Sequence, residues 1–173
     1  MKKLVLLLVT VVGFFAAVIA QPRAIGGRIG WTVEASYQHG LGDTRFLEID
    51  AGLVGYYSAQ AAVIHDWIFA SPNWTSKGTW DWYAGVGGAV GLGWRPEMRY
   101  NIYTGYYERH HYHYGFAGVA GQVGLSYTFW FPLQLSVDIR PTLGVWFNRN
   151  QVGFNGMGVW DFALSVRYAF GVR

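Results

Sequence analysis

Cysteine is absent from this 173-residue chain, and charged residues are scarce. Without cysteine, the chain has neither a disulfide framework nor a lipid-attachment cysteine behind a signal sequence. Asp, Glu, Lys and Arg together make up 13% of the residues, whereas about a quarter is usual in soluble globular domains. The composition is therefore unusual for a small soluble domain.

Two further absences narrow the range of functions. Two of the 13 basic residues are Lys2 and Lys3, which leaves 11 basic against 10 acidic residues in the rest of the chain. Since no basic run or stripe is present, we expect no binding of nucleic acid. After Ala20 there is also no apolar stretch of the ~18–20 residues that a transmembrane helix needs. Aromatic residues nevertheless reach 18%, which leaves a soluble β-structure with an apolar core or a membrane β-barrel.

The first twenty residues have the pattern of a secretory signal peptide. Two lysines precede an apolar run from Leu4 to Ile19, and Ala20 provides a small residue at the cleavage position. We therefore predict a cleavable signal peptide at 1–20 and one domain at 21–173. An uncleaved membrane anchor is the alternative, and the polar Gln21-Pro22-Arg23 that follows favours cleavage.

Strict alternation of apolar and polar residues predicts β-strands. The stretch LQLSVDIRP at 133–141 alternates without interruption, which indicates a strand with one apolar and one polar face. The same pattern predicts seven strands: Arg28–Gln38, Leu47–Leu53, Ala59–Phe69, Trp80–Trp94, Ala117–Phe129, Leu133–Phe147 and Phe162–Phe170.

The lengths of the connections suggest a topology. Short links follow the first and fifth predicted strands, at Gly40–Asp43 and Trp130–Pro132, and long links follow the fourth and sixth, at Arg95–Gly115 and Asn148–Gly158. Outer-membrane barrels have short periplasmic turns, long outer loops and an even number of antiparallel strands. We therefore predict an all-β fold, a single antiparallel transmembrane β-barrel of eight strands, with the C-terminus on the periplasmic side. The eighth strand is expected in Gln21–Gly27 or in part of the 95–115 segment.

The distribution of residues on the two faces predicts a barrel whose apolar side chains point outward and whose polar side chains point into the lumen. Aromatic residues lie near the strand ends of the apolar face with aliphatic residues between them, as in the girdles of membrane barrels. The lumen of an eight-stranded barrel is barely wide enough for side chains, so it suits the glycine-rich face of Trp80–Trp94 better than the aromatic face. The lumen is then expected to hold a structural charge network that plugs it or leaves a narrow solute path: Arg28, Glu34, Glu48, Asp50, Asp66, Asp81, Asp138, Arg140 and Arg167.

Four segments carry a family resemblance: AIGGRIGWTVEASYQHGLG, WYAGVGGAVGLG, GVAGQVGLSYTFWFPLQLSVDIRP and ALSVRYAF. They resemble the strands of small bacterial outer-membrane β-barrel proteins of the OmpA/OmpW-like type. The resemblance implies an integral protein of the outer membrane, surrounded by outer-membrane lipid, with a structural or surface-interaction role. It also implies insertion by the barrel assembly machinery, which reads a terminal strand ending in an aromatic residue such as Phe170. The chain departs from that signal by continuing to Arg173.

The histidine-rich segment is the one candidate for local chemistry. His110, His111 and His113, with Glu108, are residue types that hold borderline metal ions. Recognition of a surface partner through residues 95–115, or a purely structural hairpin, are the alternatives. No nucleophile, base and acid stand in a catalytic pattern, so we predict no enzyme and no cofactor. Two other functions stay open: a lipid-modifying barrel enzyme, and a soluble periplasmic β-barrel that binds a small hydrophobic ligand.

Overall fold

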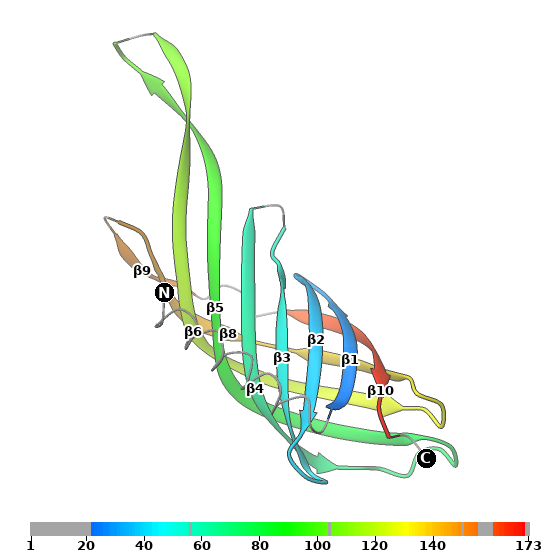
Figure 1. Cartoon of the computed structure of the whole chain (residues 1–173). Coiled ribbons are helices and arrows are strands. Elements are labelled where there is room, and N and C mark those ends of the chain that lie inside the picture. Colours follow the sequence, from blue (N-terminus) through cyan, green and yellow to red (C-terminus); the bar gives the residue numbers. More distant parts are fainter. Residues whose placement is uncertain (1–21, 56, 104, 150, 156–160, 172–173) are drawn as a thin grey trace, which may run out of the picture.

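The computed structural model describes residues 22–55, 57–103, 105–149, 151–155 and 161–171. The predicted signal peptide lies outside the described residues. Among those described, no helix is long and apolar enough to cross a bilayer. Six strands pair antiparallel with their neighbours in chain order (Figure 1): β1 (Pro22–Ile29), β2 (Val33–Gly40), β3 (Arg45–Leu53), β4 (Ser58–Ala70), β5 (Thr79–Asn101) and β6 (Tyr106–Thr128).

The remaining segments close the sheet into a barrel. β6 pairs with β7 (Gln134–Ile139) along one half and with β8 (Thr142–Phe147) along the other, so β7 and β8 form one barrel strand interrupted at Arg140–Pro141. β9 (Val152–Asn155) pairs with β8, and β10 (Phe162–Ala169) pairs with β7. β10 also pairs with β1. The prediction of an all-β, closed antiparallel barrel of eight strands is confirmed.

The eighth strand comes from the beginning of the domain. The predicted single strand Arg28–Gln38 is wrong, because the chain turns at Gly30–Thr32, between β1 and β2. Gly30 N–H donates to the carbonyl of Thr32 at 2.9 Å. The turn leaves the alternation in phase, since Ile29, Trp31 and Val33 are all exposed. β1 covers most of the Gln21–Gly27 segment, the first of the two places expected for this strand.

Both described ends of the chain lie at one end of the barrel, which we call the termini end; the other is the hairpin end (Figure 1). β1 begins and β10 finishes at the termini end, where the connections are 41–44, 71–78 and 129–133. The connections at the hairpin end are 30–32, 54–57, 102–105 and 148–151. The C-terminal strand therefore finishes at the end that carries the two predicted short links, as expected.

The longest hairpin projects beyond the barrel (Figure 1). The long link expected over 95–115 is wrong and the hairpin alternative is correct, because β5 and β6 pair as far as Asn101 and Tyr106. β4 pairs with β5 only up to Gly93, and β8 pairs with β6 only up to Gly115. Trp94–Asn101 and Tyr106–His113 therefore form a two-stranded ribbon, whose strands pair with no other strand in the described part of the chain.

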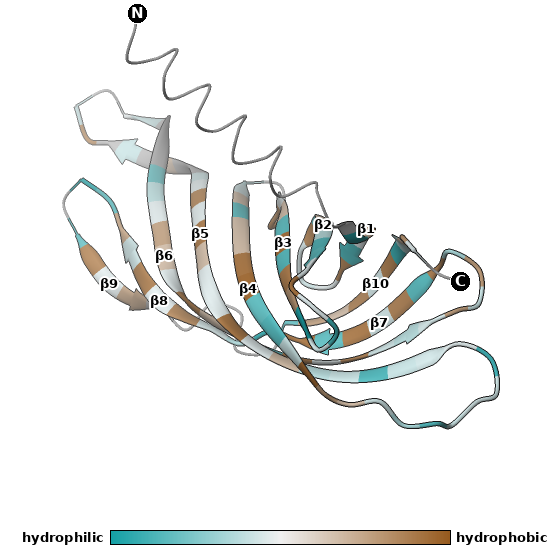
Figure 2. Ribbon diagram, turned by 60° about the horizontal axis from the view of Figure 1, so that its bottom comes forward, coloured by the Kyte–Doolittle hydropathy of each residue, from teal (hydrophilic) through white to brown (hydrophobic). Residues whose placement is uncertain are grey.

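Side chains alternate between an apolar exterior and a polar interior. Bands of hydrophobic and hydrophilic residues alternate along the strands (Figure 2). Val137 is 49% exposed whereas Asp138, its neighbour in β7, is 5% exposed. Glycines on the inner face allow close contact between strands: a Cβ atom at Gly87 would lie 1.9 Å from the carbonyl oxygen of Val63. The apolar face thus points out of the barrel, as its pattern predicts.

Candidate functional site in the lumen

The nine charged residues assigned to the polar face all lie inside the barrel. The most exposed of them, Asp81, has 8% of its surface accessible. Charged side chains in so narrow a bore must be paired or solvated. Burying an isolated charge costs a desolvation free energy on the order of several kcal/mol, even after the protein relaxes. All of these side chains except Asp66 take part in three ion-paired groups along the bore.

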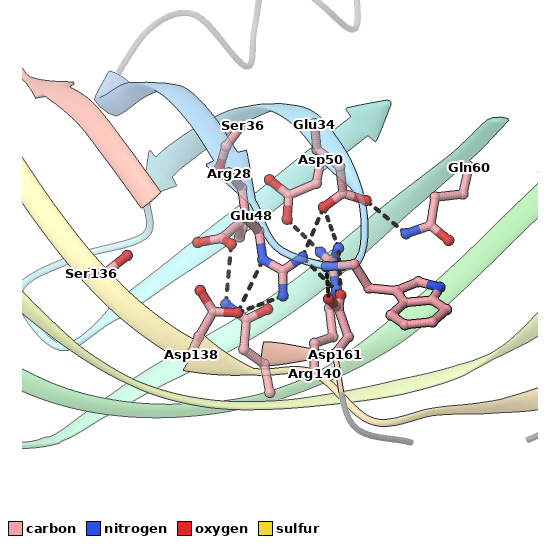
Figure 3. Close-up of polar contacts among 12 residues, drawn as sticks. Arg28, Glu34, Ser36, Glu48, Asp50, Gln60, Ser136, Asp138, Arg140 and Asp161 are labelled. Carbon is pink, nitrogen blue, oxygen red and sulfur yellow. Dashed lines mark hydrogen bonds and ion pairs between the residues drawn. The ribbon is translucent and has the colours of Figure 1, made fainter. Parts of the chain in front are cut away.

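Arg28 is the centre of the first group (Figure 3). Its Nη2 lies 2.7 Å from Asp138 Oδ1, and its Nε donates to the same oxygen at 3.0 Å. Its Nη1 lies 2.8 Å from Asp161 Oδ2 and 3.1 Å from Glu34 Oε2. One guanidinium thus contacts three carboxylates, using the directional fork that makes Arg suited to several charge-assisted bonds at once.

Arg140 completes the first group from the opposite side. Its Nη2 pairs with Glu34, and its Nη1 lies 2.5 Å from Asp50 Oδ2. Asp161 Oδ2 lies 3.8 Å from Arg140 Nη2. Glu34 and Asp161 therefore contact both arginines and join them into one network. We call this network the arginine-pair cluster: Arg28, Arg140, Glu34, Asp50, Asp138 and Asp161.

Arg167 forms the second group with Glu48. Arg167 Nη2 lies 3.0 Å from Glu48 Oε1, while its Nε and Nη1 donate to Ser36 Oγ at 2.9 Å and Ser136 Oγ at 2.7 Å. Glu48 also accepts from Gln38 Nε2 at 2.7 Å and from Gln122 Nε2 at 3.1 Å. Since these partners come from β2, β3, β6, β7 and β10, the group ties distant strands together across the bore.

The third group lies at the termini end. Arg23 Nη2 lies 3.1 Å from Asp81 Oδ2, and Ser71 Oγ donates to Asp81 Oδ1 at 2.7 Å. The guanidinium of Arg23 also stands 4.5 Å from the ring centroid of Phe46. Both charged side chains keep some contact with solvent. Asp81 thus belongs to a separate ion pair near the mouth.

Carboxyl groups outnumber guanidinium groups in the described lumen. Seven acids face four arginines: Glu34, Glu48, Asp50, Asp66, Asp81, Asp138 and Asp161, against Arg23, Arg28, Arg140 and Arg167. Asp66 is completely buried, and neither of its carboxyl oxygens has a hydrogen-bond partner within the described residues. Asp66 therefore takes no part in the three groups.

Two neutralised variants should separate paired from unpaired acids. We expect Asp138→Asn to lower the free energy of unfolding by about 2–4 kcal/mol, because it breaks a buried pair with Arg28. We expect Asp66→Asn to leave it unchanged or to raise it, since an unpaired buried acid is replaced by a neutral amide of the same shape. Urea unfolding of the two variants, followed by tryptophan fluorescence, makes the comparison. Equal losses in both variants would contradict the assigned pairing.

Two cavities lie in the barrel, one towards each end. The cavity at the termini end encloses about 720 Å³ and is lined by Arg23, Asp81 and Gln134 among others. The cavity at the hairpin end encloses about 650 Å³ and is lined by Gln60 and Asp161 among others. Arg28, Arg140, Arg167 and their partners Glu48 and Asp50 line neither cavity. The arginine-pair cluster and the Arg167–Glu48 group thus lie mainly between the two cavities, whereas the Arg23–Asp81 pair lines the cavity at the termini end.

Two members of these groups were not found from the sequence. Asp161 stands one residue before the predicted last strand, and its inward position continues the alternation of β10, so extending that pattern by one residue would have found it. Arg23 has no such signal, because an irregularity between Pro22 and Ala24 shifts the register of β1. Arg28, Glu34 and Arg140 are brought together as expected, whereas Asp66 is not.

The histidines do not assemble into a site in the described part of the chain. His113 is exposed on the ribbon, and the side chains of His110 and His111 lie outside the described residues. No group of three His, Asp or Glu side chains among those described has the spacing of a metal site. His65 stacks on Trp67 with ring centroids 4.5 Å apart, and His39 lies 3.4 Å from the hydroxyl of Tyr37.

These features define the class of the protein as a closed, eight-stranded antiparallel β-barrel with an apolar exterior and an ion-paired interior. No family model, no curated protein and no solved structure matches the chain. The fold and the lumen are therefore the basis on which a function is inferred.

Proposed function

We propose that this protein is an integral β-barrel of the bacterial outer membrane, with a structural or surface-interaction role and a charge-plugged lumen. The observation that carries the proposal is that apolar side chains cover the outside of the barrel while charged side chains fill its inside. Leu164 on the outer face is 64% exposed, whereas Arg28 and Arg167 in the bore are at most 1% exposed. Water-soluble proteins rarely leave a continuous apolar surface exposed, but a barrel in lipid requires one.

The aromatic residues support the same interpretation. At the termini end, Tyr127, Phe129, Trp130 and Phe131 pack against one another, with ring centroids 4.5–6.0 Å apart. Tyr168 and Phe170 form a further pair at 5.1 Å. Aromatic rings of this kind collect where a bilayer meets water. On this proposal the termini end faces the periplasm, and the barrel assembly machinery inserts the chain.

The filled bore favours a structural role over transport. An eight-stranded barrel has room for side chains and little else, and here the arginine-pair cluster and the Arg167–Glu48 group occupy that room. Such a polar filling also argues against a soluble barrel with an apolar interior. The projecting ribbon supplies the surface for a partner, because Tyr103, Tyr106 and Tyr107 are 92%, 76% and 69% exposed.

Site-directed spin labelling tests the membrane assignment. The chain has no cysteine, so single labels at Val137, on the outer face of β7, and at Thr44, in a connection at the termini end, are unambiguous. In lipid vesicles we expect the label at 137 to collide mainly with dissolved oxygen and the label at 44 mainly with a water-soluble nickel chelate. A label at 137 that is relaxed mainly by the nickel chelate would overturn the proposal.

Cell fractionation provides an independent check of location. After expression of the full chain in a Gram-negative host, we expect the protein in the outer-membrane fraction, extractable only with detergent. Its folded form should migrate differently before and after boiling on a detergent gel. Recovery of the folded protein in the aqueous periplasmic fraction without detergent would contradict the assignment.

A further inference from the structure

The cavity at the hairpin end has the dimensions of a small-molecule site. It encloses about 650 Å³, within the range of roughly 300–1,000 Å³ that ligand sites occupy. The β1–β2 and β3–β4 connections bound it on one side, and β5 and β6 bound it on the other. It lies above the arginine-pair cluster, whose Asp161 reaches its floor.

The walls of this cavity are largely apolar and are held in place. Tyr57, Tyr114 and Phe116 line it, and Tyr57 is half exposed. Tyr114 and Ser58 are joined by a hydrogen bond of 2.9 Å between their hydroxyl groups, which links β6 to β4 across the cavity. Phe116 is 8% exposed, so its ring forms a fixed surface. A flat apolar body would find contact area here without much rearrangement of the protein.

The floor is polar and offers mainly acceptors. Thr32 lines the cavity and is 3% exposed, yet its Oγ1 has no hydrogen-bond partner within the described residues. Gln60 commits its Nε2 to Glu34 at 2.7 Å, which leaves its carbonyl oxygen as an acceptor. Asp161 accepts from Trp31 N–H at 3.2 Å and from Arg28 at 2.8 Å, and it adds negative charge to the floor. A buried hydroxyl without a partner is uncommon and calls for an explanation.

We propose that this cavity binds a small amphipathic molecule that carries a protonated amine on an aromatic or aliphatic body. The ammonium group would donate hydrogen bonds to Thr32 Oγ1 and the Gln60 carbonyl, beside the carboxylate of Asp161. The carboxylate of Asp161 and the acceptor oxygens beside it suit a cationic donor and disfavour a carboxylate or phosphate. The body would lie among Tyr57, Tyr114 and Phe116. The inference depends on the barrel and its cavity, and it does not depend on where the barrel resides in the cell.

The test compares three probes of one shape and different head groups. The purified chain in detergent is titrated with 2-phenylethylamine, 2-phenylethanol and phenylacetate, and amide chemical shifts are recorded against matched titrations of protein-free micelles. We expect saturable shifts in residues 30–32 and 58–60 for the amine, weaker ones for the alcohol and none for phenylacetate. Equal binding of phenylacetate and the amine would overturn the proposal, as would shifts confined to the termini-end cavity.

Two variants test the assigned contacts. Thr32→Val keeps the shape of the side chain and removes the hydroxyl, so we expect the affinity for the amine to fall about three- to tenfold, the usual worth of one hydrogen bond. Thr79→Val is the matched control, since Thr79 lines the other cavity, and should leave binding unchanged. Ser58→Trp should abolish binding by filling the hairpin-end cavity. If the amine binds the folded Ser58→Trp protein with unchanged affinity, the site is wrong.

Discussion

Replacing Arg28 by Met is expected to lower the free energy of unfolding by about 3–5 kcal/mol, the usual cost of removing one partner from a buried ion pair. Arg28 contacts Asp138, Glu34 and Asp161 within 3.1 Å. Its loss leaves Asp138 without an ion-pair partner in the described lumen, while Glu34 and Asp161 share only Arg140. The expected effect is larger than the loss of packing alone, because Met fills much of the volume that the aliphatic part of Arg occupies.

Urea unfolding in lipid vesicles, followed by tryptophan fluorescence, measures this effect. Arg149→Met is the matched control, since Arg149 is exposed in the β8–β9 connection, and should change the free energy of unfolding by less than about 0.5 kcal/mol. The double variant Arg28→Met/Asp138→Asn should recover part of the loss, because it removes the uncompensated acid together with its partner. A single variant no less stable than the control would show that the cluster is dispensable.

Placing an arginine on the outer face, in Leu164→Arg, should cost about 2–4 kcal/mol in vesicles. Leu164 is 64% exposed and is the third residue of β10, and on the proposed placement it faces the hydrocarbon. A guanidinium there must leave water or deform the bilayer to reach the headgroups. In a water-soluble barrel the same substitution would add a charge to an exposed position and cost almost nothing. The sign and size of this effect thus report directly on the solvent around the barrel.

Two further variants serve as controls for Leu164→Arg. Phe170→Arg places the same group beyond the end of β10, where a bilayer meets water and the cost should fall to about 0–1 kcal/mol. Leu164→Met keeps the position apolar and should be close to neutral. All three are unfolded in vesicles under the same conditions. A Leu164→Arg protein as stable as Leu164→Met would refute a lipid-facing outer surface.

The fold was predictable where alternation is long and uninterrupted. β3, β4 and β10 occupy nearly the residues that the pattern assigns, whereas the predicted strand Leu133–Phe147 is divided into β7 and β8. The failures have physical causes. The alternation of apolar and polar residues continues unchanged through the turn at Gly30–Thr32. The end of β1 and the beginning of β2 therefore appear in the sequence as one strand. In the β5–β6 ribbon, Pro96 and a run of charged and aromatic residues hide the alternation, although the pairing continues to Asn101.

The lumen was predictable as a set of residues but not as a set of contacts. Alternation shows which side chains point inward, and it placed Arg28, Arg140 and Arg167 correctly. It contains no information on how far along the bore two strands meet, because that depends on the register across neighbouring strands. The alternation pattern therefore gives Asp66 and Asp138 the same inward orientation and does not distinguish them. In the structure, Asp138 forms an ion pair with Arg28 at 2.7 Å, whereas Asp66 accepts no hydrogen bond in the described lumen.

The pairing of the first strand with the last has a consequence for biogenesis. The seam between β1 and β10 joins Gly26 to Arg167 and Ile29 to Leu164, so it forms only when nearly the whole chain is available. Arg28 likewise meets Asp138 and Asp161 across sequence separations of 110 and 133 residues. A nascent chain that lacks its final strand therefore has two sheet edges with unpaired backbone groups. Its Arg28 also lacks its contact with Asp161. The closure of the barrel and the assembly of the arginine-pair cluster therefore both depend on the last strand of the chain.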